Sequence, residues 1–191
     1  MLVTEENSDS ISEEEFFTFL KKRQGILDGV CISGGEPTLQ KDLAEFIKKI
    51  KAMGYAVKLD TNGSNPDILI NLISENLIDY VAMDIKNSPE KYSITCGCDV
   101  NVDKIKESVS IIIESGINHE FRTTTVREYH SAEDFEAIAQ WLKGDSKYFL
   151  QHFEDSGNLI GENLSPLSKD EMTAFAESMR SKLSNVDIRG V

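Results

Sequence analysis

Short segments rich in apolar residues alternate with amphipathic helical patterns along most of this chain. A strand followed by a helix, repeated several times, is typical of α/β proteins whose strands form a parallel sheet. Several of these strands are nearly continuous apolar runs, which favours burial on both faces. The pattern predicts a barrel or a partial barrel. The expected strands are Gly29–Ser33, Ala56–Thr61, Ile78–Ile85, Glu120–Val126 and Tyr148–Gln151.

The predicted helices carry their own start and stop signals. Ser12 and Glu15 form a capping box ahead of one apolar stripe, and a second stripe from Leu43 to Met53 ends at Gly54. Residues 154–166 are the least regular part and are a candidate mobile loop on the functional face. No linker divides the chain, so we expect a single domain over residues 1–191. Further helices are expected at Pro66–Glu75, Val102–Ser115, Ala132–Lys143 and Lys169–Lys182. With one flanking residue on each side, the last of them forms a C-terminal helical region over 168–183.

The charge balance narrows the range of partners. The chain has 33 acidic and 20 basic residues, a net charge of −13, so it would approach nucleic acid or an anionic membrane against their own negative potential. No apolar run approaches the roughly 18 residues of a membrane span, and the acidic N-terminal region has no signal-peptide pattern. We expect a cytoplasmic protein that binds neither nucleic acid nor membrane, with its three cysteines reduced.

Chemically useful side chains stand at the carboxyl ends of the predicted strands, where α/β proteins place their sites. Two glycines let a ligand approach the backbone, and the carboxylates of Glu36 and Asp60 suit an ammonium group. Lys86 suits a carboxylate, and Asp84 is available for ribose hydroxyls. The pattern therefore predicts a site for a zwitterionic amino-acid ligand. The candidate residues are Gly34, Gly35, Glu36, Asp60, Asp84, Lys86 and His152.

Three motifs in a fixed order resemble one family. The runs Ser33–Gln40, Leu59–Gly63 and Met83–Lys86 are similar to those of glycyl-radical-enzyme activases in the radical S-adenosylmethionine superfamily. The resemblance is strongest to the activating proteins of anaerobic ribonucleoside-triphosphate reductase, and second to pyruvate formate-lyase activases. It continues to Ile188-Arg189-Gly190 and so covers nearly the whole chain. It implies a partial (β/α) barrel of the TIM type with S-adenosylmethionine lying across its top.

The resemblance also assigns roles to individual residues. It implies that Gly34, Gly35 and Glu36 contact the methionyl amine of the cofactor and that Asp60 supplies a second carboxylate there. Asp84 and Lys86 match the family's Asp-x-Lys pair.

Three further points of the resemblance are weaker. His152 falls where the family has a late histidine near the nucleoside, although Gln151 and Phe153 do not reproduce the formate-lyase activase pattern. Arg122 matches an arginine on a later strand and ranks below the others. In formate-lyase activases a monovalent cation lies beside the equivalents of Asp60 and Asp84, and the sequence alone does not decide whether one binds here.

One part of the family pattern is missing. The family holds a [4Fe–4S] cluster with a Cys-x-x-x-Cys-x-x-Cys loop, whereas Cys96 and Cys98 have the wrong spacing and Cys31 is expected to be an inert core thiol in a strand. The resemblance therefore implies an N-terminally truncated radical SAM core that lacks the first strand and the cluster loop, and no cluster is expected in this chain. The strand edge left without a partner is expected to associate or to be disordered.

The favoured function is that of the complete enzyme. It is expected to reduce S-adenosylmethionine, form a 5′-deoxyadenosyl radical and abstract hydrogen from a glycine of anaerobic ribonucleotide reductase, with electrons from a flavodoxin- or ferredoxin-type donor. One alternative is the activase of pyruvate formate-lyase or of another glycyl radical enzyme. Another is a radical-incompetent barrel that only binds a nucleoside or a protein. Ordinary turns and a solvated charge pair would also produce each motif singly, but the three in order disfavour that interpretation.

Overall fold

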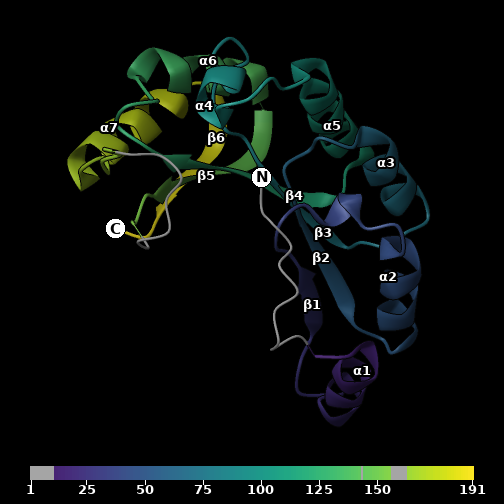
Figure 1. Ribbon diagram of the computed structural model, residues 1–191. Coiled ribbons are helices and arrows are strands. Elements are labelled where there is room, and N and C mark those ends of the chain that lie inside the picture. Colours follow the sequence, from purple (N-terminus) through teal and green to yellow (C-terminus); the bar gives the residue numbers. More distant parts are fainter. Residues whose placement is uncertain (1–10, 143, 156–162) are drawn as a thin grey trace.

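Six parallel strands follow one another across a single sheet in the order in which they occur in the chain. The computed structural model describes residues 11–142, 144–155 and 163–191. The sheet curves into an arc, and the helices lie along its outer side (Figure 1). This is the predicted α/β fold, a partial barrel of the TIM type. The strands are β1 (Gly29–Ile32), β2 (Ala56–Thr61), β3 (Tyr80–Asp84), β4 (Asn118–Thr125), β5 (Gly144–His152) and β6 (Leu183–Arg189).

The helices begin and end close to the residues that the sequence indicated. The Ser12 hydroxyl accepts from the Glu15 amide at 3.2 Å, and the Glu15 carboxylate accepts from the Ser12 amide at 2.8 Å, which confirms the first capping box. Within the described ranges, no helix is both long and apolar enough to cross a bilayer. The helices are α1 (Glu13–Lys22), η1 (Pro37–Leu39), α2 (Leu43–Ala52), α3 (Pro66–Ser74), α4 (Tyr92–Cys96), α5 (Val102–Ser115), α6 (Ala132–Leu142) and α7 (Lys169–Met179).

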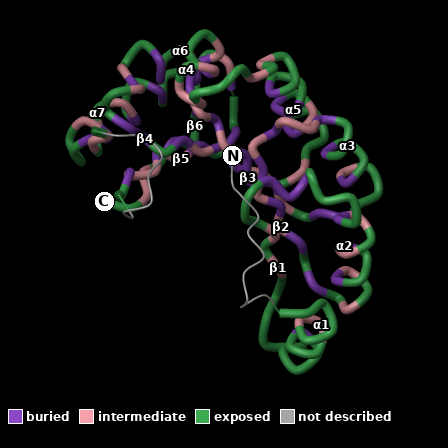
Figure 2. The backbone as a smooth tube through the Cα atoms, in the orientation of Figure 1, coloured by how far each residue is buried: buried purple, intermediate pink, exposed green. Residues whose placement is uncertain are grey.

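The two faces of the sheet differ in polarity. The buried stretches of the tube lie where strands meet helices (Figure 2). Leu59, Met83 and Phe121 share one face of the sheet by their register and are fully buried. Their neighbours on the same strands, Asp60 and Arg122 among them, are only half-buried. The expectation that the strands are buried on both faces therefore holds for the middle of β3, where Val81, Ala82 and Met83 are fully buried, and is wrong at the charged positions of β2 and β4. One face packs against helices, and the inner face carries charges.

The first strand is at an edge of the sheet. Among the described residues, β1 pairs with β2 alone. Association or disorder at its other edge stays a prediction. Helix α1 packs beside this end of the sheet, where the rings of Phe16 and Phe46 stack at 5.3 Å. The Tyr55 hydroxyl donates to the Leu20 carbonyl at 2.6 Å and ties the end of α1 to the start of β2.

The C-terminal region contains a strand that the sequence pattern did not predict. Helix α7 ends at Met179, and β6 follows it and pairs with β5, so that Val186 lies opposite Tyr148. The apolar residues of β6 do not alternate regularly, because Ser184 and Asn185 separate Leu183 from Val186. The short helix α4 was also not predicted. Residues 156–162 of the predicted loop lie outside the described residues, so that interpretation stays a prediction, as does the single domain.

Candidate functional site

Six of the seven predicted site residues line one cavity at the carboxyl ends of β1, β2 and β3. The cavity has a volume of about 610 Å³. Because the strands are parallel, the residues that follow or end them share one edge of the sheet. Arg122, which the sequence ranked lower, lines the same cavity, and His152 does not. The lining also includes Ser33, Leu39, Thr61 and Asn62.

The loop after β1 leaves its backbone open to a ligand. Gly34 and Gly35 have φ angles of +89° and +41°, in the left-handed region that favours glycine. A Cβ atom built on either residue would meet no atom of the described residues within 4 Å. The part of the protein that the structure describes therefore leaves the space above this loop open to a ligand that lies against the main chain.

The Glu36 side chain is turned into the loop and is 9% exposed. Its Oε1 atom accepts from the Thr38 amide at 3.2 Å, the Thr38 hydroxyl at 2.5 Å and the Thr61 hydroxyl at 2.7 Å. Its Oε2 atom accepts from the Asn62 amide at 2.6 Å. The carboxylate thus joins the loops after β1 and β2. Among the described residues, Oε1 receives three donors and Oε2 receives one, so Oε2 is the oxygen with capacity for a further donor.

Four charged side chains form the floor of the cavity. The Arg122 guanidinium lies between two carboxylates, with Nη1 3.1 Å from Asp60 Oδ2 and Nε 2.6 Å from Asp84 Oδ1. The second oxygen of Asp84 accepts from Lys86 Nζ at 2.8 Å. Burial raises the pKa of Asp84, but Lys86 and Arg122 outweigh it and hold that pKa below its usual value. The site therefore presents paired charges of both signs, as a zwitterionic ligand requires.

Cys31 contacts this cluster and is exposed, so the expectation of an inert core thiol is wrong. Its Sγ atom lies 3.6 Å from Asp60 Oδ1, with the thiol donating, and partial burial together with Asp60 raises the pKa of Cys31. The Ser33 hydroxyl donates to the other oxygen of Asp60 at 3.2 Å, and Lys58 Nζ lies 3.3 Å from Oδ1. Asp60 is therefore already neutralised by protein partners, and a ligand amine would have to share or displace one of them.

His152 ends β5 and lies opposite Thr125 in the register, three positions beyond Arg122. Its Nδ1 atom is buried and has no hydrogen-bond partner among the described residues. A Cβ atom on Gly190, whose φ is +83°, would come within 3.3 Å of the His152 side chain. The structure thus places His152 on the same edge of the sheet as the cavity but outside its lining.

Sequence analysis missed a second charged cluster lower on the inner face. The Glu120 carboxylate, whose side chain is 5% exposed, is bound by Arg189 through two bonds of 2.9 Å. The Tyr80 hydroxyl donates to it at 3.1 Å, and burial together with Glu120 raises the pKa of Tyr80 to about 12. Glu120 and Arg122 are two residues apart on one strand, and this alternation was the only signal that both face inward.

The three cysteines do not fit an iron–sulfur cluster. Cys31 belongs to β1, Cys96 ends α4 and Cys98 follows it, whereas a cluster of this kind needs several thiolates on one loop or brought together by the fold. Within the described ranges, no group of three or more His, Cys, Asp or Glu side chains is arranged to hold a metal ion. The described residues therefore do not supply the ligands of a cluster.

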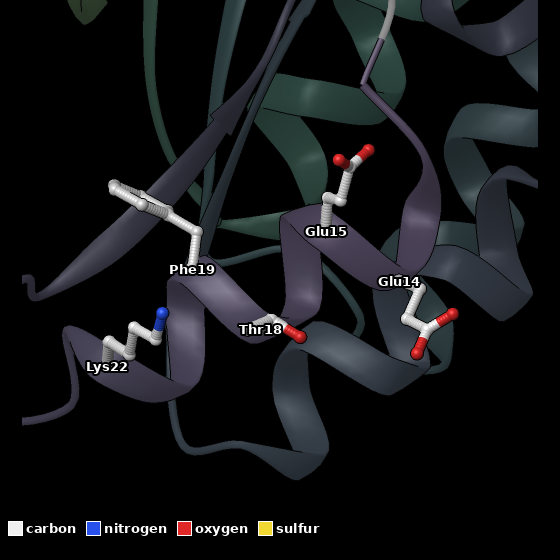
Figure 3. Close-up of a pocket in the computed structure, with 5 residues that line it drawn as sticks. All are labelled: Glu14, Glu15, Thr18, Phe19 and Lys22. Atoms are coloured by element: carbon white, nitrogen blue, oxygen red, sulfur yellow. The ribbon is translucent and has the colours of Figure 1, made fainter.

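Helix α1 carries another hollow, of about 350 Å³, on its surface. Figure 3 shows that its five lining side chains spread along the helix and do not converge on one point. They come from a single element, outside the three sequence motifs. This hollow therefore offers no constellation for chemistry. The lining residues are Glu14, Glu15, Thr18, Phe19 and Lys22.

Sequence comparison places residues 4–142 within the radical SAM superfamily. A protein of Methanocaldococcus jannaschii named "Putative glycyl-radical enzyme activating enzyme MJ1227" is 36% identical over 86% of this chain and 71% of its own length. A second protein of that organism, "Putative glycyl-radical enzyme activating enzyme MJ1632", is 28% identical over 84% of this chain and 62% of its own length. The chain thus spans about two thirds of the length of these relatives.

Solved structures agree on the fold. A domain of pyruvate-formate lyase-activating enzyme from Bacteroides vulgatus superposes with a TM-score of 0.69 at 13% identity, over 85% of this chain and 99% of that one. Streptococcus suis SuiB bound to S-adenosylmethionine gives a TM-score of 0.67 at 14% identity, over 98% of this chain and 45% of that one. With a family match over most of its length and a relative above 30% identity, this chain belongs to the radical SAM superfamily, among the glycyl-radical-enzyme activating enzymes.

Proposed function

We propose that this chain binds S-adenosylmethionine at the cavity after β1 to β3 and serves the activation of anaerobic ribonucleotide reductase. The observation that carries the proposal is the convergence of Asp60, Asp84, Lys86 and Arg122 beside the open glycine loop. A methionyl group has an ammonium and a carboxylate, and a site that presents both signs against open backbone suits it. Family membership supports the same ligand.

Each residue of the cavity has a defined contribution in this proposal. Gly34 and Gly35 give the methionyl group access to the main chain, and the unused acceptor site on Glu36 Oε2 receives its ammonium. Lys86, whose side chain is 44% exposed, is free to exchange Asp84 for the ligand carboxylate. Asp84 then turns to the ribose hydroxyls while Arg122 keeps it ionised. His152 is proposed for the nucleoside.

S-adenosylmethionine bound there, given one electron, would release methionine and a 5′-deoxyadenosyl radical, which would take hydrogen from a glycine of the partner to leave 5′-deoxyadenosine and a glycyl radical. The protein binds and orients the cofactor and excludes water. We propose that the cluster ligands are not among the cysteines of this chain, and that electrons come from a flavodoxin- or ferredoxin-type donor in the cytoplasm. Activation of pyruvate formate-lyase or another glycyl radical enzyme is the second candidate, favoured by the fold of the Bacteroides vulgatus domain.

The proposal is tested with the protein joined to a Cys-x-x-x-Cys-x-x-Cys segment ahead of residue 1 and reconstituted anaerobically. Incubation with S-adenosylmethionine, dithionite and anaerobic ribonucleotide reductase is expected to give the doublet of a glycyl radical in electron paramagnetic resonance spectra. The test variant carries Asp84→Asn, a nearly isosteric substitution that removes one charge from the cavity and should lower the release of 5′-deoxyadenosine. A doublet on formate-lyase alone would assign the second candidate, and release of 5′-deoxyadenosine that is unchanged by Asp84→Asn would refute the site.

A further inference from the structure

Three consecutive carbonyl groups at the end of β3 are held by buried side chains. The Tyr92 hydroxyl donates to the Asp84 carbonyl at 3.3 Å, and the Thr123 hydroxyl donates to the Ile85 carbonyl at 2.6 Å. His130 Nε2 lies 2.9 Å from the Lys86 carbonyl. Buried carbonyl groups are paired with backbone, side chains or water, and here side chains contribute to the pairing of three successive residues. Here the chain leaves the sheet at Asp84, just where the proposed ligand contacts begin.

The three donors belong to different elements and stand behind the site. Tyr92 begins α4, Thr123 is in β4, and His130 lies in the turn before α6. Their residues are 2%, 1% and 6% exposed, and none lines the cavity. They therefore contact the backbone of the Asp84–Lys86 segment without reaching a ligand.

His130 contacts the backbone through both ring nitrogens. Its Nε2 atom lies 2.9 Å from the Lys86 carbonyl, and its Nδ1 atom lies 3.1 Å from both the amide and the carbonyl of Val126. The tautomer with its proton on Nε2 satisfies the Lys86 carbonyl and the Val126 amide together, because a carbonyl only accepts and an amide N–H only donates. Both ring nitrogens are thereby used, and the ring links the loop after β3 to the loop after β4. The Asn87 side chain, fully buried, adds a second link by donating to the Tyr129 carbonyl at 2.8 Å.

A further layer supports the central donor. The Tyr148 hydroxyl of β5, which is fully buried, donates to the Thr123 hydroxyl at 2.5 Å, so Thr123 must direct its own proton elsewhere. The Ile85 carbonyl is the acceptor it finds. The Ile85 amide also donates to the Arg122 carbonyl at 2.9 Å, which fixes this segment against β4 from the other side.

We infer that Tyr92, Thr123 and His130 are positioning residues that fix Asp84 and Lys86 for ligand binding. This inference rests on the proposed function, in which those two residues contact S-adenosylmethionine. Among the described residues, the side chain of Lys86 forms an ion pair with Asp84 alone and is 44% exposed. Its backbone is therefore the part that the protein can hold in place, and the three buried donors hold it.

The test compares variants that remove a hydrogen-bond donor from the Asp84–Lys86 backbone with variants that leave the donor in place. Tyr92→Phe removes a hydroxyl, and Thr123→Val is made together with Tyr148→Phe so that no buried hydroxyl loses its acceptor. His130→Gln keeps a donor at the Nε2 position, whereas His130→Asn keeps only the acceptor at Nδ1. The matched control is Tyr55→Phe, since Tyr55 is 4% exposed and also donates to a backbone carbonyl, but at α1.

The first readout is the amide NMR spectrum of the 191-residue chain without ligand. The amides of residues 85 to 87 are expected to shift in Tyr92→Phe, in the Thr123 and Tyr148 double variant and in His130→Asn, and to stay close to wild type in His130→Gln and Tyr55→Phe. A ring nitrogen spectrum should show His130 protonated on Nε2. Unchanged amides in the three donor variants would overturn the inference whatever the ligand is.

The second readout is binding of S-adenosylmethionine, titrated to millimolar concentration. The dissociation constant should rise about three- to tenfold in each donor variant, as expected for one neutral hydrogen bond, while His130→Gln and Tyr55→Phe bind like wild type. Shifted amides with unchanged affinity would overturn the positioning role. A wild-type chain that binds no S-adenosylmethionine refutes the proposed function, and the amide shifts then decide the inference alone.

Discussion

The substitution Glu36→Gln should destabilise the protein although it preserves shape. Each carboxylate oxygen of Glu36 accepts from a backbone amide that cannot turn away: Oε1 from Thr38 at 3.2 Å and Oε2 from Asn62 at 2.6 Å. A glutamine amide has one oxygen and one NH₂ group. Whichever way it is oriented, its NH₂ group faces a backbone N–H, so one buried donor loses its acceptor.

The expected magnitude follows from these contacts. Replacing the carboxylate forfeits one charge-assisted hydrogen bond and leaves a backbone N–H without a partner in a side-chain environment that is 9% exposed. Such a loss costs about 2–3 kcal/mol in the free energy of unfolding. For a chain of this size, about 2–4 °C is lost for each kcal/mol, so the melting temperature should fall by roughly 4–12 °C.

Urea unfolding followed by circular dichroism measures the effect, with Glu45→Gln as the control. The Glu45 side chain is 72% exposed and pairs with Lys48 at 2.9 Å on the surface of α2. Its substitution should change the free energy by less than about 0.5 kcal/mol. If Glu36→Gln unfolds at the same urea concentration as Glu45→Gln, the carboxylate does not organise the two loops, and its role would be confined to the ligand.

Three further outcomes are expected. Lys86→Ala should weaken S-adenosylmethionine binding to the cluster-bearing protein by about 1.5–3 kcal/mol. Isothermal titration measures the effect, with Lys106→Ala as the control, because the Lys106 side chain is 49% exposed and pairs with Asp103 on the surface. Equal affinities of the two variants would remove Lys86 from the site. Anaerobic reconstitution of the 191-residue chain should give no stable [4Fe–4S] centre in Mössbauer spectra, and a stoichiometric cluster would show that the ligands have been misplaced. Burial raises the pKa of Glu120, but Arg189 and Lys58 outweigh it and hold that pKa below its usual value. The ion pair of Glu120 with Arg189 therefore stabilises the fold above the usual pKa of a glutamate, and this stabilisation is lost as the pH falls through the lowered pKa. The difference in urea stability between wild type and Arg189→Met should shrink on acidification, and a constant difference would exclude the ion pair as its source.

The sequence predicted which residues meet at the cavity because the direction of the strands determines most of its lining. Once the strands are taken as parallel, the residues at their carboxyl ends must share an edge, and Gly34, Asp60 and Asp84 follow directly. The detailed pairing did not follow. Arg122 lies between Asp60 and Asp84 because β3 and β4 pair with Asp84 opposite Arg122, and such a register depends on both strands and on the two helices between them, α4 and α5.

Other features were hidden for different reasons. Cys31 was expected in the core because its strand was interpreted as apolar on both faces, whereas the inner face of this sheet is polar and exposes the thiol. The donors behind Lys86 were not found because Tyr92, Thr123 and His130 act through hydrogen bonds to the main chain. Such contacts leave no periodicity in a sequence. They depend on where three separate elements meet.

The charged inner face explains how an open sheet of this kind is stable. In closed barrels of this class, inward side chains pack into layers of a core. Here the inner face has ion pairs at two levels, Glu120 with Arg189 below and Arg122 with Asp60 and Asp84 above. Each of these charges has its partner on the inner face itself, so the hydrophobic contribution comes from the outer face and its helices. Among the described residues no apolar core fills the cavity, so the proposed ligand would enter by exchanging ion pairs.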